Sequence, residues 1–339
     1  MKEPSQINYN NLTGRIFALK QGDAQAFEEL ALEVFALQYE HNSLYRAFCD
    51  NLSVKRANVI NIFQIPFLPI SFFKTQRIIT EVRKTAPGVV FTSSGTSQSG
   101  VSSHYVTDVS LYEKSFLEAF HLFYGPPSGY CILGLLPSYL ERSGSSLVYM
   151  TDKLIELSGH ALSNFYLNNY DELIAVIEKL KQQKQRTLLL GVSYALLDLA
   201  ARNVQLDDHF IVMETGGMKG RREEMTKSAL QLTLQRKLGI SQVHSEYGMT
   251  ELLSQAYSKA GGQFACPPWM KILIRDANDP FSYLAAGKAG GINIIDLANI
   301  NSCSFISTQD LGRQQDNGMF ELLGRFDNSD IRGCNLLVE

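Results

Sequence analysis

The stretch VVFTSSGTSQSG at residues 89–100 places a hydroxyl-rich loop directly after a short apolar run. The loop itself, residues 92–100, holds two glycines and six serines or threonines within nine positions. Glycine lets a backbone approach an anion closely, and successive N–H groups can form an anion-binding nest. No Gly-Lys-Ser/Thr follows, which argues against a P-loop nucleotidase. By composition alone a flexible surface loop is the simpler interpretation. The loop becomes a candidate phosphate site only together with other motifs.

The pattern of the chain from this loop onwards predicts an α/β fold. From about residue 88, short apolar runs alternate with amphipathic segments, which is typical of strands and helices with the site in loops at strand ends. The expected strands are residues 89–91, 130–136, 187–191, 210–214 and 291–297, and the expected helices are residues 170–184 and 219–238.

The N-terminal part has a different pattern. Residues 11–50 have helical spacing of apolar positions, and residues 59–73 are apolar and extended because Pro66 and Pro69 exclude a continuous helix. We expect a single domain over residues 1–339. It would comprise a helical subregion at 1–85, a nucleotide-binding core at 86–324, and a C-terminal hinge and tail at 325–339.

Composition excludes several classes of protein. The chain has 339 residues, is 45% hydrophobic and 19% charged, and carries a net charge of −3, as ordinary globular proteins do. No basic stripe indicates nucleic acid. Five widely spaced cysteines without a Cys-x-x-Cys pair fit neither a disulfide framework nor a zinc knuckle. No signal peptide or membrane-spanning run is evident, so a cytoplasmic protein is expected.

Two further motifs carry chemistry. In VHSEYGMTE (243–251), Gly248 permits a turn, the Tyr247 ring can stack on a purine, and the Glu251 carboxylate can bind Mg²⁺. A strand end followed by a capped helix is the structural alternative. In STQDLG (307–312) and GRFDNSDIRG (324–333), Asp310 can accept both hydroxyls of a ribose, although each piece alone is turn chemistry.

The order of these motifs resembles that of the adenylate-forming superfamily, which includes acyl-CoA synthetases, luciferases and peptide-synthetase adenylation domains. The chain is similar in particular to the acyl-protein synthetase (LuxE-type) family of bacterial bioluminescence systems, from about residue 60 to the C-terminus. The stretches that carry the similarity are IPFLPISFFK (65–74), FTSSGTSQSG (91–100), METGGMKGRREEM (213–225), HSEYGMTEL (244–252) and LLGRFDNSDIRGCNLL (322–337).

The resemblance implies the large N-terminal domain of an adenylate-forming enzyme, with ATP and Mg²⁺ as cofactors. It implies that Thr250 contacts the α-phosphate and that Glu251 binds the metal. The other implied ATP- or AMP-binding residues are Ser94, Gly95, Thr96 and Ser97 for the β- and γ-phosphates; Gly216, Gly217, Met218, Glu246 and Tyr247, with Gly248, around the adenine and acyl pockets; and Asp310 and Arg325 for the ribose.

The sequence departs from the superfamily pattern at two places. The lysine that commonly follows the phosphate loop is missing, and His104 is a candidate substitute. No lysine follows Lys288, so the usual C-terminal lysine-bearing domain is not expected.

Near the C-terminus, Cys334 matches the cysteine that accepts the acyl group in the resembled family. A thiolate is strongly nucleophilic, and Arg332 can lower the thiol pKa. The alternative for Cys334 is a small apolar residue at the chain end. Of the other cysteines, Cys266 is a candidate for the acyl pocket, and Cys49, Cys131 and Cys303 are expected in the core.

The leading hypothesis is therefore an ATP-dependent, AMP-forming acyl-protein synthetase. It would activate a carboxylic acid, expected to be a fatty acid, transfer the acyl group to Cys334 as a thioester, and deliver it to an acyl-CoA-reductase-type partner. One alternative is a ligase that hands its adenylate to coenzyme A or a carrier protein. Another is a non-catalytic subunit of a reductase complex. The identity of the acid and the oligomeric state stay open.

Overall fold

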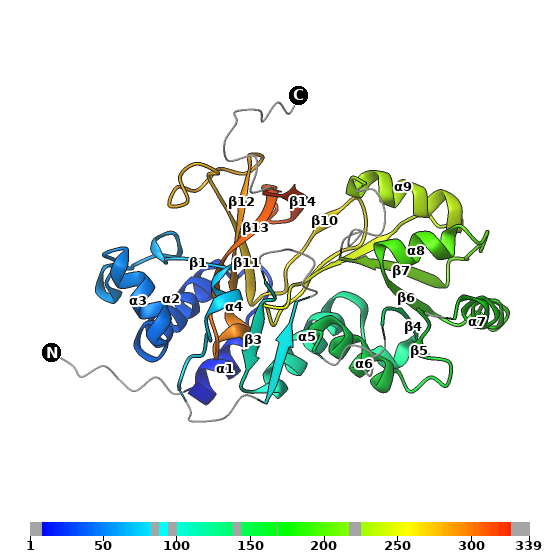
Figure 1. Ribbon diagram of the computed structural model, residues 1–339, viewed down its shortest axis with the longest axis horizontal. Helices are drawn as coiled ribbons and strands as arrows, with labels where there is room; N and C mark the ends of the chain where they lie inside the picture. Colours follow the sequence, from blue (N-terminus) through cyan, green and yellow to red (C-terminus); the bar gives the residue numbers. More distant parts are fainter. Residues whose placement is uncertain are drawn as a thin grey trace.

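The chain forms a mixed α/β structure in the computed structural model, which describes residues 9–82, 88–93, 100–137, 144–167, 169–216 and 225–326 (Figure 1). Within these residues the strands pair into a mainly parallel sheet, an antiparallel sheet and a two-stranded hairpin. The expected α/β class is confirmed. Among the described helices, none combines the length and the apolar character that a membrane span requires.

The mainly parallel sheet has the strand order β5-β4-β6-β7-β8-β9. All neighbouring pairs are parallel except β8 and β9, which are antiparallel. Its strands are β5 (Asn164–Phe165), β4 (Cys131–Leu135), β6 (Thr187–Val192), β7 (Phe210–Thr215), β8 (His244–Tyr247) and β9 (Ala256–Ser258). The helices that accompany them are α5 (Val109–Tyr124), α6 (Ser146–Ser158), α7 (Tyr170–Gln182), α8 (Ser193–Ala200) and α9 (Lys227–Leu238).

The antiparallel sheet has the order β10-β14-β13-β12-β11, and β1 adds to the start of β13 as a parallel neighbour. Its strands are β1 (Leu68–Pro69), β10 (Gln263–Phe264), β11 (Met270–Arg275), β12 (Ala289–Asp296), β13 (Phe305–Gln314) and β14 (Phe320–Arg325). Asp310 on β13 lies directly opposite Arg325 on β14 in this register. The hairpin joins β2 (Val89–Thr92) to β3 (Ser103–Val106) across the hydroxyl-rich loop.

The N-terminal helices pack against the antiparallel sheet. They are α1 (Tyr9–Phe17), α2 (Ala24–His41) and α3 (Ser43–Asn51), which confirms the helical prediction for residues 11–50. Buried Phe305 at the start of β13 contacts Phe35 of α2 and Tyr45 of α3, with ring centroids 6.2 and 6.0 Å apart. The Nε2 atom of Gln38 donates to the carbonyl oxygens of Asn299 and Ile300, both at 3.1 Å. These contacts make the helices part of the same core.

The extended segment at residues 59–73 is built from short pieces. After η1 (Arg56–Asn58) come η2 (Ile62–Gln64), strand β1 and the single-turn helix α4 (Phe72–Thr75). The absence of a continuous helix agrees with the prediction from the two prolines. A last 3₁₀ turn, η4 (Leu297–Asn299), follows β12, and η3 (Pro127–Gly129) precedes β4.

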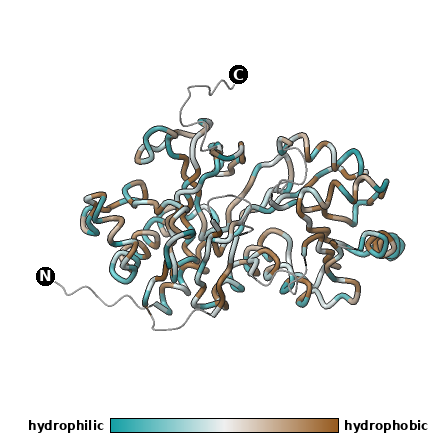
Figure 2. The backbone as a smooth tube through the Cα atoms, in the orientation of Figure 1, coloured by the Kyte–Doolittle hydropathy of each residue, from teal (hydrophilic) through white to brown (hydrophobic). Residues whose placement is uncertain are grey.

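Helix α9 begins later than expected. The pattern predicts a helix over residues 219–238, but α9 starts at Lys227. Thr226 is extended, and its side chain accepts a hydrogen bond from the Ala229 amide, as an N-cap residue does. Helices α5, α6 and α8 were not named from the pattern. Figure 2 shows hydrophobic stretches along the inner strands and hydrophilic ones on outer loops, as a single buried core requires.

Phe305→Ala should lower the free energy of unfolding by about 3–5 kcal/mol, because it removes the ring that joins the N-terminal helices to the sheet. Urea denaturation measures this change. The control is Phe281→Ala, whose side chain is 63% exposed and whose replacement should alter stability by no more than about 0.5 kcal/mol. Equal effects of the two substitutions would contradict the packing described here.

Candidate functional site

The two ends of the hydroxyl-rich loop are joined at its base. The Ser93 amide donates to the Ser102 carbonyl oxygen at 3.1 Å, and the Ser102 amide donates to Ser93 Oγ at 3.0 Å. The Thr92 amide also donates to the Gly144 carbonyl oxygen at 2.7 Å. The proposed phosphate ligands Ser94, Gly95, Thr96 and Ser97 lie outside the described residues. The structure therefore describes the base of this loop, which lies beside the turn that follows β8.

Glu251 lies in the turn that follows β8, and its carboxyl group is next to this loop base. The Ser102 hydroxyl donates a hydrogen bond to the Glu251 carboxylate. Burial raises the pKa of Glu251, while Ser102 and the positive charge of Arg325 act in the opposite direction. Thr250 is half-buried in the same turn. Residues 248–255 form no helix, so the alternative of a strand end followed by a capped helix is wrong for the part after the strand.

The residues present fit a Mg²⁺ ion that is shared with a nucleotide. Mg²⁺ in phosphate-transfer sites is commonly held by one or two carboxylates together with substrate phosphates. Among the described residues, no group of three or more histidine, cysteine or acidic side chains can hold a metal ion. The Glu251 carboxylate can offer one hard oxygen ligand, and the compensation it receives from Ser102 and Arg325 does not fully offset its burial. A cation brought in with phosphates would supply that compensation.

Tyr247, Asp310 and Arg325 form a connected polar group between the two large sheets. The Tyr247 hydroxyl donates to Asp310 Oδ2 at 2.8 Å, and Arg325 Nε donates to Asp310 Oδ1 at 3.0 Å. Burial raises the pKa of Tyr247 well above its usual range, so the hydroxyl stays protonated and donates. Rings of Phe264 and Phe320 pack edge-on against the Tyr247 ring. The structure thus brings together three residues that lie far apart in the sequence.

The Glu246 side chain contacts strand β7, whereas the Tyr247 side chain contacts Asp310 of the antiparallel sheet. Its carboxyl group accepts a hydrogen bond from the Thr215 hydroxyl at the end of neighbouring strand β7. Burial raises the pKa of Glu246 to about 7, and the nearby Glu214 adds to the rise. A Cβ atom at Gly248 would lie 2.4 Å from Glu246 Oε1, so a side chain there would displace the Glu246 carboxyl group. Gly248 therefore shapes the turn by making room for a carboxyl group.

Glu214 and Lys227 form an ion pair beside Glu246 that the sequence motifs did not indicate. Glu214 is buried at the end of β7, and Lys227 Nζ lies 2.7 Å from its Oε1 atom. The Ser193 hydroxyl donates to the carbonyl oxygen of Gly216 at 2.8 Å, and Gly216 has a φ of +67°, which favours glycine. The stretch METGG (213–217) contains Glu214, but nothing in it indicates that Glu214 pairs with Lys227. Gly217 and Met218 lie outside the described residues.

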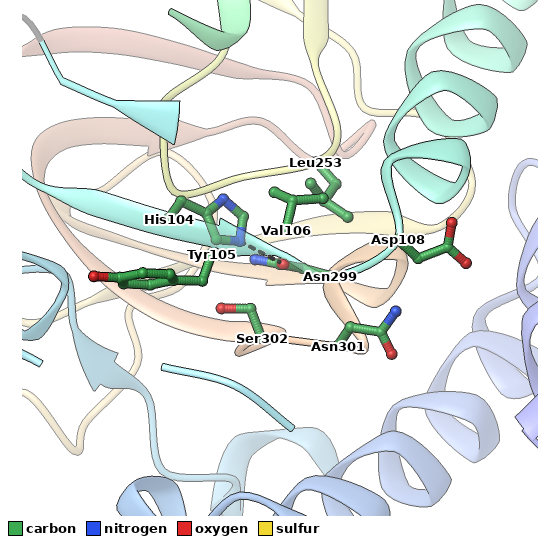
Figure 3. A pocket seen from close by; sticks show the side chains of 8 residues that line it. All are labelled: His104, Tyr105, Val106, Asp108, Leu253, Asn299, Asn301 and Ser302. Carbon is green, nitrogen blue, oxygen red and sulfur yellow. Dashed lines mark hydrogen bonds between the residues drawn. The ribbon is translucent and has the colours of Figure 1, made fainter. Parts of the chain in front are cut away.

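His104 does not replace the missing phosphate-loop lysine. Its ring is buried, with Nδ1 2.8 Å from the Thr250 carbonyl oxygen and Nε2 3.2 Å from Asn299 Oδ1 (Figure 3). Burial lowers the pKa of His104 to about 4, so the imidazole is neutral at pH 7. An enclosed, neutral ring provides no cation for a phosphate group. The hollow beside it is too narrow to hold a water-sized sphere.

The cysteines divide as expected where they are described. Cys49, Cys131 and Cys303 are buried, which confirms the prediction that they belong to the core. Cys266 is half-buried, and burial raises the pKa of its thiol to about 12. Cys334, the expected acyl acceptor, lies outside the described residues.

The family comparison agrees with the resemblance found in the motifs. The family described as "Acyl-protein synthetase, LuxE" matches residues 4–116, which include the N-terminal helices and the hydroxyl-rich loop. The motif similarity begins later, at about residue 60, and continues beyond the matched segment. No curated protein sequence matches the chain.

Solved structures share the fold at low sequence identity. ATP-bound MatB from Rhodopseudomonas palustris is 17% identical with a TM-score of 0.54; the match covers 73% of this chain and 50% of MatB. O-succinylbenzoate coenzyme A synthetase (MenE) from Bacillus subtilis, in complex with ATP and magnesium, is 17% identical with a TM-score of 0.51, covering 72% and 51%. An open 2-hydroxyisobutyryl-CoA ligase with 2-HIB-AMP and CoA is 13% identical with a TM-score of 0.64, covering 91% and 77%.

The chain therefore has the fold of the large N-terminal domain of adenylate-forming enzymes, as predicted. It spans about half the length of the first of these structures, since the match covers 50% of MatB. At these identities the likeness establishes the fold and leaves the reaction to be argued from the site.

Replacing Glu246 with glutamine should change how stability depends on pH. The folded protein keeps the Glu246 proton up to about pH 7, whereas the unfolded chain loses it near pH 4.5. Wild-type stability should therefore carry a component that falls as pH rises through this window, by about 3 kcal/mol in total. Glu246→Gln should remove it.

Urea denaturation of both proteins at pH 5 and pH 7.5 measures this difference. The buried histidines contribute equally to both proteins, so comparing them isolates Glu246. Parallel pH profiles for the two proteins would show that the carboxyl group is not protonated when folded.

Proposed function

We propose that the chain, which resembles the acyl-protein synthetase (LuxE) family and has the fold of adenylate-forming enzymes, activates a carboxylic acid with ATP and releases pyrophosphate. The observation that carries this proposal is the meeting of the loop base at Ser102 with Glu251 and with the Asp310–Arg325 pair. A phosphate-loop base, a metal-binding carboxylate and a diol acceptor are the three parts that an ATP-dependent adenylation needs in one place.

The ribose would bind at Asp310. An ionised carboxylate has about four acceptor positions on its two oxygens. In Asp310 each oxygen already accepts one hydrogen bond, from Tyr247 or Arg325. One position on each oxygen is therefore left for the two hydroxyls of a ribose. The side chain of Arg325 is 72% exposed, so its remaining N–H donors are accessible to a nucleotide.

In the proposed reaction, a carboxylate oxygen of the substrate attacks the α-phosphorus of ATP. The new P–O bond forms as the bond to the pyrophosphate oxygen breaks, and negative charge develops on the phosphoryl oxygens. Preorganised donors stabilise that charge best when they lie in a partly buried site. The Thr250 hydroxyl and the Arg325 guanidinium are the donors we assign to this task. Mg²⁺ bound by Glu251 would neutralise phosphate charge.

For the second half of the reaction we propose transfer of the acyl group to the Cys334 thiol, which displaces AMP and forms a thioester. The acid would be a fatty acid, and an acyl-CoA-reductase-type protein would receive the acyl group. We assign residues 1–339 to one domain with the subregions expected from the sequence, and in this proposal the last segment, 325–339, would bring Cys334 to the site. Transfer to coenzyme A or a carrier protein is the alternative.

Wild-type protein should catalyse ATP–pyrophosphate exchange that depends on a carboxylic acid and on Mg²⁺. Glu251→Gln should lower kcat for exchange by about 10²–10³-fold, because it removes a charged oxygen ligand of the ion. The control Glu178→Gln changes a carboxylate in α7, outside the site, and should leave exchange unchanged. If no acid in a broad panel supports exchange, the chain is the non-catalytic alternative.

Cys334→Ala should keep the exchange activity and lose covalent acylation. Intact-protein mass spectrometry with ATP and a fatty acid measures the added acyl mass, which hydroxylamine should remove. Cys49→Ala is the matched control, since its thiol is buried in the core, has a pKa raised to about 12 and should not be the acceptor. Acylation that survives Cys334→Ala would exclude the terminal thioester.

A further inference from the structure

The turn at residues 250–254 is held in place by side chains from other parts of the chain. It follows β8 and is neither helix nor strand, so its backbone groups need partners outside regular secondary structure. The Thr250 carbonyl oxygen lies 2.8 Å from His104 Nδ1, and the Glu251 carbonyl oxygen accepts from Asn299 Nδ2 at 2.9 Å. Both carbonyls of the two proposed catalytic residues are therefore fixed from outside the turn.

Asp296 holds the other end of the same turn. Its Oδ2 atom accepts the amides of Leu253 and Ser254 at 2.8 and 3.0 Å, and its Oδ1 atom accepts the Ser254 hydroxyl at 2.5 Å. Asp296 ends β12 and Asn299 ends the η4 turn that follows, so both come from one corner of the antiparallel sheet. His104 comes from β3, on the far side of the hydroxyl-rich loop.

Asn299 can make these contacts in only one orientation. Its Nδ2 atom donates to the carbonyl oxygens of Glu251 and Cys303, both at 2.9 Å. Turning the amide over would place an oxygen against two oxygens. Its Oδ1 atom therefore faces His104 Nε2 at 3.2 Å, while His104 Nδ1 lies 2.8 Å from the Thr250 carbonyl oxygen. Figure 3 shows His104, Leu253 and Asn299 around the narrow hollow between these elements.

The three side chains are buried inside the protein. His104, Asp296 and Asn299 have exposed fractions of 1%, 0% and 1%, so water does not compete for their hydrogen bonds. His104 and Asn299, which hold the Thr250 and Glu251 carbonyls, are neutral donors and add no positive charge beside Glu251. With both of these carbonyls fixed, the side chains of Thr250 and Glu251 leave the backbone in a defined direction. For Glu251 that direction is towards Ser102, with Asp310 and Arg325 close enough to affect its charge.

We propose that Asn299, Asp296 and His104 are positioning residues that hold the Thr250–Glu251 backbone so that the Glu251 carboxylate meets the metal of a bound nucleotide. This inference rests on the proposed adenylation. Residues that orient a metal ligand from behind commonly change metal affinity or activity by about 10–100-fold when they are replaced. Asn299 contacts Glu251 itself, through its carbonyl oxygen, and His104 and Asp296 contact its neighbours in the turn.

The sharpest test is Asn299→Asp, which keeps the shape of the side chain and removes both N–H donors. The Mg²⁺ concentration for half-maximal ATP–pyrophosphate exchange should rise by about 10–100-fold. Hydrogen–deuterium exchange of the amides at residues 250–254, measured without nucleotide, should become faster. Asn42→Asp is the matched control, because buried Asn42 also donates Nδ2 to a carbonyl, that of Ser302 at 2.9 Å. It should lower the melting temperature without changing the Mg²⁺ requirement.

A second pair of variants covers the possibility that Asn299→Asp does not fold. His104→Asn retains an N–H donor near the position of Nδ1, whereas His104→Leu does not. The asparagine variant should reach half-maximal exchange at nearly the wild-type Mg²⁺ concentration. The leucine variant should need about 10–100-fold more Mg²⁺. Equal behaviour of the two, or a change confined to melting temperature, would overturn the positioning role.

Failure of the proposed function gives a different result. If the wild type shows no exchange with any acid, adenylation is excluded, and amide exchange decides whether the turn is held as described. Faster exchange at residues 250–254 in Asn299→Asp, with no change there in Asn42→Asp, would still support the restraint. Unchanged protection in both variants would overturn it.

Discussion

The hydrogen bond from the Tyr247 hydroxyl to Asp310 joins the two large sheets, and the candidate site is arranged around it. Tyr247 ends a strand of the parallel sheet, and Asp310 lies within a strand of the antiparallel sheet, 2.8 Å away. Phe264 and Phe320 enclose the tyrosine ring, so the bond forms in a place of low polarity where hydrogen bonds are strong. It also orients Asp310 so that its other oxygen meets Arg325. Nucleotide recognition, on the function we propose, depends on this junction.

The site contains acids that burial makes unfavourable. Glu246 and Glu251 both have raised pKa values because their carboxyl groups lose hydration, and Glu214 adds negative charge that Lys227 balances. Perturbed acids of this kind gather at functional sites, where local stability is given up for chemistry. The loss is limited here by buried neutral donors. The Thr215 hydroxyl donates a hydrogen bond to Glu246 and the Ser102 hydroxyl donates one to Glu251, so each carboxyl group has a hydrogen-bond partner.

Much of the secondary structure could be predicted because the spacing of apolar residues and the length of each apolar run determine it locally. The runs at 187–191 and 210–214 became β6 and β7, and residues 170–184 became α7 with slightly different ends. The helix expected from residue 219 starts only at Lys227, because the Thr226 side chain caps it by accepting from the Ala229 amide. His104 was misjudged for a different reason. Its position after the loop suggested a phosphate ligand, whereas its environment makes it a buried neutral donor.

The sequence by itself determined the α/β class, the order of the motifs and the identity of Tyr247, Asp310, Arg325 and Glu251 as candidate site residues, because hydrophobic period and short motifs are local properties of the chain. Only the tertiary structure decided which residues hold them. Asp296 and Asn299 lie more than forty residues from the turn that they restrain. Lys227 at the start of α9 forms an ion pair with Glu214 at the end of β7. Such partners are chosen by sheet register and helix packing, which bring distant backbone and side-chain groups together, and no local pattern records that choice.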